Sequence, residues 1–114
     1  MQYLLLINDE EADDRADLMP EYMAFSEEVR GSGVLVDANQ LQPAHTATTL
    51  RVRDGETLVT DGPFIETKET LGGYYLIDVG SLDEALEWAA KIPSARYGHI
   101  EVRPIVMRQA EVGA

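Results

Sequence analysis

One group of side chains that could do chemistry lies in residues 61–69, whose sequence is DGPFIETKE. Asp61, Glu66 and Glu69 are carboxylates that could serve as a general base, a general acid or weak metal ligands. Lys68 could hold an anionic ligand or lower the pKa of a neighbouring carboxylate. The Asp-Gly-Pro run also forces a turn. The alternative is therefore a rigid turn in which the aspartate bonds backbone amides or a nearby hydroxyl and the other charges face solvent.

Few other residues could assist this loop. His45 lies in the segment that enters the next hairpin, close to the Thr48 hydroxyl, and could act as a general base toward Asp61. Arg51 could clamp the carboxylate of a ligand. Tyr74 or Tyr75 could turn its hydroxyl into a pocket, although packing is the usual role of a strand tyrosine. For His45 the alternative is simple exposure to solvent.

Composition excludes several classes of function. The chain has 114 residues, no cysteine and a formal charge of −12, and this charge argues against nucleic acid as a direct partner. No HExxH, GxSxG or glycine-rich phosphate loop occurs, so we expect no cofactor and no metal site. The longest purely apolar stretch has four residues, and no secretory signal is visible. We therefore expect a cytoplasmic protein without a membrane segment.

The clearest local pattern is a hairpin. Asp54-Gly55 is favoured in two-residue type I′ turns, and the flanking residues 48–53 and 56–61 have strand character. The resulting register pairs Arg53 with Glu56 and Thr48 with Asp61. It places three apolar side chains on one face of the hairpin: Leu50, Val52 and Val59.

Outside the hairpin, the expected order of elements is strand, helix, strand, strand, helix, strand. This is the split βαβ plan of ferredoxin-like α+β domains, in which two helices cover one face of the sheet. The length suits a single domain over residues 1–114. The expected strands are residues 3–7, 34–41, 71–79 and 99–107, and the expected helices begin near Pro20 and Ser81.

An acidic run at residues 9–17 joins the first strand to the first helix and contains six carboxylates and Arg15. We interpret it as a solvated connector. The alternative is a cation site or a partner-binding surface, but the glycine turn and closing glutamate of a calcium loop are missing.

The two strands expected at the centre of the sheet, residues 3–7 and 74–79, are apolar on both faces. Two helices can cover only one of these faces, and an exposed apolar sheet is unusual for a monomer. We therefore expect a homodimer packed sheet to sheet, as in dimeric α/β barrels, with the inserted hairpin embracing the partner.

The run Asp61-Gly62-Pro63-Phe64, followed by Leu71-Gly72-Gly73-Tyr74-Tyr75, resembles the DGPF family of the YCII-related superfamily. The similarity extends over nearly the whole chain. It implies a ferredoxin-like fold that is usually dimeric, but it implies no reaction, because most members are uncharacterised. DGPF proteins also look like genomic companions of extracytoplasmic-function sigma factors, which implies a functional link to sigma-factor regulation.

The resemblance also bears on a catalytic site. YCII-type relatives that look enzymatic are thought to use a histidine–aspartate dyad, whose histidine follows a proline at the start of the first helix. The corresponding run here is Pro20-Glu21-Tyr22, so Tyr22 stands where that histidine would be. This departure leaves Asp61 as half of a site, with His45 or Tyr22 as its partner.

Three interpretations follow. We prefer a small dimeric ligand-binding or regulatory protein, whose loop recognises a small molecule or a transcription protein. The alternative is a small-molecule enzyme with a pocket between sheet and hairpin, in which Asp61 is the base and Arg51 orients an anion. A third, structural interpretation makes the loop a dimer clasp.

Overall fold

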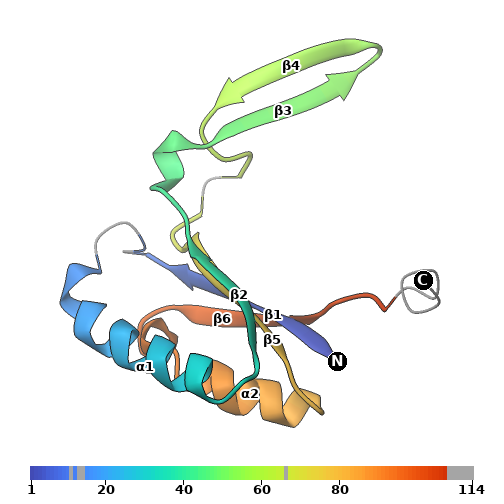
Figure 1. Cartoon of the computed structure of the whole chain (residues 1–114). Coiled ribbons are helices and arrows are strands. Elements are labelled where there is room, and N and C mark those ends of the chain that lie inside the picture. Colours follow the sequence, from blue (N-terminus) through green and yellow to red (C-terminus); the bar gives the residue numbers. More distant parts are fainter. Residues whose placement is uncertain (11, 13–14, 66, 108–114) are drawn as a thin grey trace.

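The protein is described from a computed structural model, which covers residues 1–10, 12, 15–65 and 67–107. A four-stranded antiparallel sheet has the strand order β2–β5–β1–β6, and β3–β4 form a separate hairpin (Figure 1). This is the ferredoxin-like order expected from the sequence. The strands of the sheet are β1 (Gln2–Asp9), β2 (Leu35–Gln40), β5 (Thr70–Asp78) and β6 (His99–Pro104). The helices are α1 (Met19–Gly31) and α2 (Leu82–Ala90), with short 3-10 turns η1 (Ala16–Leu18), η2 (Ala44–Thr46) and η3 (Pro93–Arg96).

The core lies between the helices and one face of the sheet. Alternate residues of β1 point toward the helices, so Tyr3, Leu5 and Ile7 are buried. Phe25 of α1 packs edge-on against the Tyr75 ring, with the ring centroids 5.0 Å apart. Both helices therefore cover the same face, as predicted.

The helix boundaries follow local chemistry. Pro20 occupies the first turn of α1, where its missing N–H costs no hydrogen bond. Ser81 caps α2, because its side chain accepts a hydrogen bond from the Glu84 N–H at 3.2 Å. In the described ranges, neither helix has the length and hydropathy needed to cross a membrane.

The hairpin β3 (Thr48–Arg53) and β4 (Glu56–Asp61) has the predicted register, from Thr48 opposite Asp61 to Arg53 opposite Glu56. Asp54 and Gly55 have φ values of 53° and 80°, as a type I′ turn requires. The hairpin stands away from the sheet (Figure 1). We call residues 44–65 the arm and the remainder of the described chain the body.

The second face of the sheet is not covered by a helix (Figure 1). Its central strands present Leu4 and Leu6 from β1, and Tyr74 and Leu76 from β5, and all four side chains are only half-buried. The expectation that the central strands are apolar on both sides is confirmed. We call this surface the open face.

Candidate functional site

A cavity of about 630 Å³ lies between α1 and the β2–β5 side of the sheet. Met19, Tyr22 and Met23 line it from α1, because residues three and four apart share one side of a helix. The opposite wall is backbone and side chains of β2 and β5. Proteins bind small molecules in cavities of this size.

A glycine pair shapes the β5 wall of this cavity. A Cβ atom on Gly73 would lie 2.8 Å from the backbone oxygen of Asn39 in β2, so the two strands approach too closely for a larger residue. A Cβ on Gly72 would lie 3.0 Å from the Ala12 Cβ. Because these two residues have no side chain, β5 can lie close to β2 and to Ala12 along this wall of the cavity.

Asp9 is a polar residue of the cavity lining, and its exposed fraction is 1%. Arg15 donates two hydrogen bonds to its carboxylate, from Nε at 2.8 Å and from Nη2 at 2.9 Å. The Arg15 guanidinium also lies 4.6 Å from the Tyr97 ring centroid. This two-pronged pairing compensates the buried negative charge.

The interpretation of residues 9–17 as a solvated connector was wrong for Asp9. The first strand runs two residues beyond its predicted end, and the alternation that buries Ile7 also points Asp9 toward the helices. Residues 11, 13 and 14 lie outside the described residues. Extending the alternation of buried residues from Ile7 by two positions would have predicted that Asp9 is buried.

Two tyrosine hydroxyls, those of Tyr22 and Tyr75, also belong to the polar lining. Tyr22 donates a hydrogen bond to the Ser94 Oγ at 2.6 Å, and the Tyr75 and Ser26 hydroxyls are 2.9 Å apart. Burial raises the pKa of Tyr22 and of Tyr75 above the ordinary value, more than these hydrogen bonds lower it. Both phenols are therefore neutral at physiological pH and can exchange hydrogen bonds with a bound molecule.

The residues predicted from the sequence are divided between the cavity and the arm. Tyr22 and Tyr74 line the cavity. The Tyr74 hydroxyl, however, donates to the Asp37 carboxylate at 3.0 Å and accepts from the Asn39 amide at 2.8 Å. Lys68 is exposed just before β5, and Glu66 lies outside the described residues.

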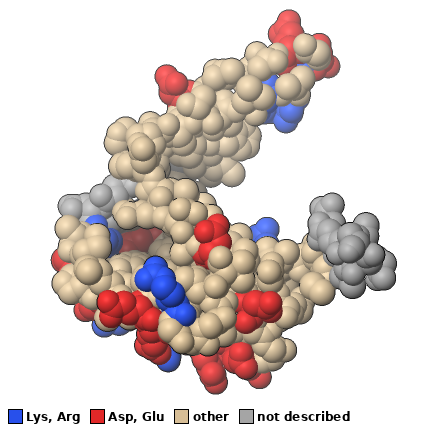
Figure 2. All heavy atoms as spheres, viewed as in Figure 1, with Lys and Arg blue, Asp and Glu red and all other residues tan. Residues whose placement is uncertain are grey.

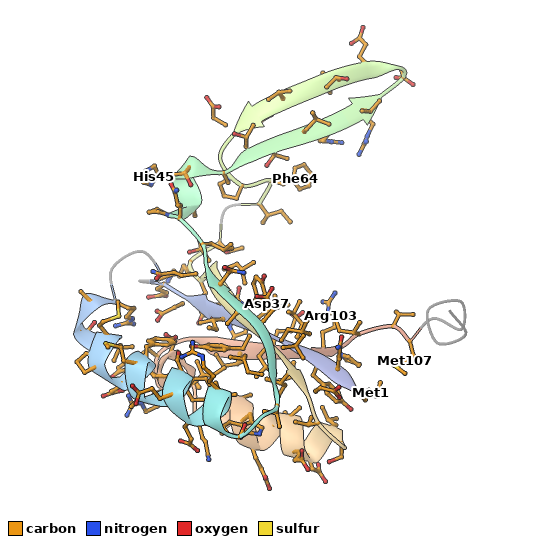
Figure 3. All side chains as sticks on the ribbon, viewed as in Figure 1. Met1, Asp37, His45, Phe64, Arg103 and Met107 are labelled. Atoms are coloured by element: carbon orange, nitrogen blue, oxygen red, sulfur yellow. The ribbon has the colours of Figure 1, made fainter. Side chains whose placement is uncertain are left out.

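The arm carries His45, Thr48, Arg51 and Asp61. Asp61 is exposed and lies opposite Thr48 in the hairpin, and the described part of the chain gives it no hydrogen bond to His45 or Tyr22. His45 and Phe64 project from opposite sides of the base of the arm (Figure 3). Among the described residues of one chain, Asp61, His45 and Tyr22 are therefore not joined by hydrogen bonds.

Arg51 is held by an aromatic ring. Its guanidinium lies 5.1 Å from the centroid of the Phe64 ring, and its buried Nε has no hydrogen-bond partner among the residues that the structure describes. No group of three or more histidine, aspartate or glutamate side chains within the described ranges could hold a metal ion. Sequence reasoning named neither Ser26 nor Ser94, and it treated Asp9 and Arg15 as part of the acidic connector rather than of this cavity.

A family comparison decides where this chain belongs. The sequence profile of the YCII-related domain matches residues 1–108. The chain belongs to the YCII-related domain family. A relative of this YCII-related domain, the uncharacterised protein R00369 of Rhizobium meliloti (strain 1021), is 44% identical over 99 residues. That match covers 85% of this chain and 78% of the relative.

A solved structure has a similar fold. It is the 5-chloro-2-hydroxyhydroquinone dehydrochlorinase TftG from Burkholderia phenoliruptrix AC1100, in complex with 2,5-dihydroxybenzoquinone. The TM-score is 0.57 and the identity 15%, and the match covers 96% of this chain and 98% of TftG. The likeness supports the ferredoxin-like assignment of this YCII-related domain.

Proposed function

We propose that this YCII-related domain is a small homodimeric ligand-binding protein, whose ligand occupies the cavity between α1 and β2–β5. The cavity itself carries the proposal: about 630 Å³ of space is lined by a buried ion pair and two neutral tyrosine hydroxyls. Such a combination of apolar walls and few directed polar groups is typical of small-molecule sites.

The lining favours a ring-sized molecule with hydroxyl or carbonyl groups. Ile7, Met19 and Met23 provide apolar contact, and thioethers adapt to flat ligands. Tyr22 and Tyr75 provide hydroxyls that can donate or accept hydrogen bonds. Among the described lining residues the charges balance, since Asp9 is paired with Arg15, and Glu27 and Arg30 contribute one charge of each sign. We therefore expect shape and hydrogen bonding to determine the affinity more than net charge.

A calorimetric screen of hydroxylated and carbonyl ring compounds tests this proposal, beginning with 2,5-dihydroxybenzoquinone as a probe. Ala38 faces the cavity from β2, so Ala38→Met should fill part of it and weaken binding by at least roughly tenfold. Ala90 is exposed on α2, and Ala90→Met is the matched control. A screen in which Ala38→Met never changes a saturable binding signal would contradict the proposal.

The candidate catalytic residues of the enzymatic alternative are divided between the arm and the cavity. Asp61 and His45 lie in the arm, whereas Tyr22 and the buried Asp9 adjoin the cavity. Asp61 could act as a base only on a molecule that reaches the arm, for instance between two copies. In that case Asp61→Asn should abolish turnover while the variant still binds the probe in calorimetry.

We infer from Asp61-Gly62-Pro63-Phe64 that the chain belongs to the DGPF branch of the family. On the same basis we propose that the protein is cytoplasmic and that it has a functional link to sigma-factor regulation. A transcription assay with RNA polymerase and the extracytoplasmic-function sigma factor of the same genome tests the link. We expect the protein to change promoter output, and unchanged output at saturating protein would contradict it.

A further inference from the structure

The α1 wall of the cavity carries different chemistry at its two ends. Met19 and Tyr22 line the cavity from the start of α1, and Ser26 and Arg30 line it toward the end of the same helix. Positions three or four residues apart share one side of a helix. At a rise of 1.5 Å per residue, Met19 and Arg30 are roughly 16 Å apart along the helix axis. A ligand lying along α1 therefore meets different groups at its two ends.

At the start of α1, the polar groups bind one another. Arg15 donates to the Asp9 carboxylate from Nε at 2.8 Å, and Tyr22 donates to the Ser94 Oγ at 2.6 Å. A buried charge requires such a partner. The ion pair is neutral as a unit, so this end of the cavity offers hydrogen bonds rather than charge.

At the end of α1, Arg30 is a cation without such a partner. No carboxylate of the described ranges forms an ion pair with it, including that of Glu27, which lines the cavity one turn earlier. The Arg30 side chain is exposed. A cation in the last turn also complements the helix dipole, which would by itself explain an arginine at this position. The groups beside it indicate a second role.

Two hydroxyls lie beside this end of the helix. The Ser26 Oγ and the Tyr75 Oη are 2.9 Å apart, and both residues line the cavity. Ser26 precedes Arg30 by four positions, so their side chains are neighbours on α1. Burial raises the pKa of Tyr75, and the Ser26 hydrogen bond and the positive charge of Arg30 partly offset this rise. The guanidinium therefore acts on the same hydroxyl pair.

This set of groups matches the hydrogen-bonding pattern of a carboxylate. The bond between the two hydroxyls uses one of their two protons, so the other proton is available to a ligand. A guanidinium is a donor only, and a carboxylate is an acceptor only. Hydrogen bonds between such charged groups are roughly twice as strong as those between neutral groups. An uncharged oxygen would therefore gain less from Arg30 than a carboxylate.

The acidity of the whole molecule does not prevent an anion from binding here. Figure 2 shows acidic side chains along the lower side of the body, over the helices, with basic side chains among them. The formal charge of the chain is −12. At physiological ionic strength, exposed charges more than about 8 Å apart are largely screened from each other. A carboxylate in contact with a guanidinium is well within this distance, so the local attraction outweighs the distant repulsion.

We propose that the ligand of the cavity is a ring compound with a carboxylate group, and that Arg30 binds this carboxylate together with the Ser26 and Tyr75 hydroxyls. The ring lies along the apolar part of the α1 wall, and the opposite end of the ligand reaches Tyr22. This inference rests on the proposed binding function and makes it more specific. A lining with balanced charges is compatible with it, because Arg30 is not paired within that lining.

Calorimetry of the full chain with two probes of similar size tests the assignment. The probes are 2,5-dihydroxybenzoate, which is an anion, and 2,5-dihydroxybenzamide, which is uncharged. We expect the unmodified protein to bind the benzoate at least roughly tenfold more tightly. Arg30→Gln should reduce this ratio of affinities to about one, because it removes the charge. Circular dichroism should show a folded variant, since the Arg30 side chain is exposed.

Arg53→Gln is the matched control and should keep the preference, because Arg53 lies at the end of β3 in the arm and not in the cavity lining. Equal affinities of the unmodified protein for the two probes would overturn the proposal, as would a preference that Arg30→Gln retains. If the benzamide binds and the benzoate is not preferred, only the carboxylate assignment fails. If neither probe nor 2,5-dihydroxybenzoquinone binds the folded protein, the proposed function fails as well.

Discussion

At the scale of single residues, Asp9 depends on a charged partner because it is buried. Its carboxylate is 1% exposed and is held by two hydrogen bonds from Arg15. Removing the charge from one member of a buried ion pair is strongly destabilising. We expect Asp9→Asn to lower the free energy of unfolding by about 3 kcal/mol in urea denaturation.

The pair formed by Glu28 and Lys91 is the matched control, because both side chains are about half exposed. Glu28→Gln should change the free energy of unfolding by less than about 1 kcal/mol. Equal effects of the two substitutions would show that burial does not set the strength of the Asp9 pair.

The two buried phenols predict a dependence of stability on alkaline pH. Burial raises the pKa of Tyr22 and Tyr75, so the folded state keeps protons that the unfolded state releases near pH of about 10. In that window the unfolded state binds fewer protons, and the free energy of unfolding therefore falls as pH rises. Below about pH 9 these groups should contribute no slope.

Urea denaturation across this pH range measures the effect. Tyr22→Phe removes one of the two groups and should make the alkaline decline shallower. The substitution should also cost about 1 kcal/mol at neutral pH, because the buried Ser94 hydroxyl loses its partner. An unchanged alkaline slope would contradict the assigned cause.

At the scale of elements, Gly98 controls how β6 meets β1. A Cβ atom there would lie 1.9 Å from the Asn8 carbonyl oxygen and 2.8 Å from the Asp9 Cα. Both contacts are with backbone atoms, so no side-chain rotation can relieve the clash. We expect Gly98→Ala to destabilise the fold by more than about 3 kcal/mol or to prevent folding.

Gly31 at the end of α1 provides the opposite case. A Cβ there would meet nothing within 4 Å, and its φ is not positive. Gly31→Ala should therefore stabilise the protein by roughly 0.5 kcal/mol, since alanine restricts the unfolded chain. Thermal denaturation of the two variants side by side would reveal this difference in sign.

At the scale of the whole molecule, assembly and stability should be coupled. If only folded chains dimerise, association stabilises the folded state by mass action, and the melting temperature rises with protein concentration. We expect this rise for the unmodified chain and its absence for Phe64→Glu, because Phe64 is exposed in the arm, which we expect to contact the partner. A melting temperature independent of concentration in both proteins would contradict the dimer.

Patterns within a few residues were sufficient for most of the fold. Asp54-Gly55 determined the turn and the register of the arm, because a two-residue type I′ turn fixes which residues of the two strands lie opposite each other. Alternation in β1 and capping by Ser81 likewise depend on neighbours in the chain. The candidate site was harder to predict, since Tyr22 meets Ser94 and Asn39 meets Tyr74 across long separations in sequence.

The sequence alone determined the ferredoxin-like order of elements, the hairpin and the central strands that are apolar on both faces. Each of these features depends on the spacing of apolar residues and on turn residues that are close together in the chain. Only the tertiary structure decided that Arg15 pairs with Asp9 beside a cavity, and that Asp61 and His45 lie in the arm rather than in the cavity lining. Which side chains share a space depends on how helices and strands pack, and that packing joins residues that no short-range pattern relates.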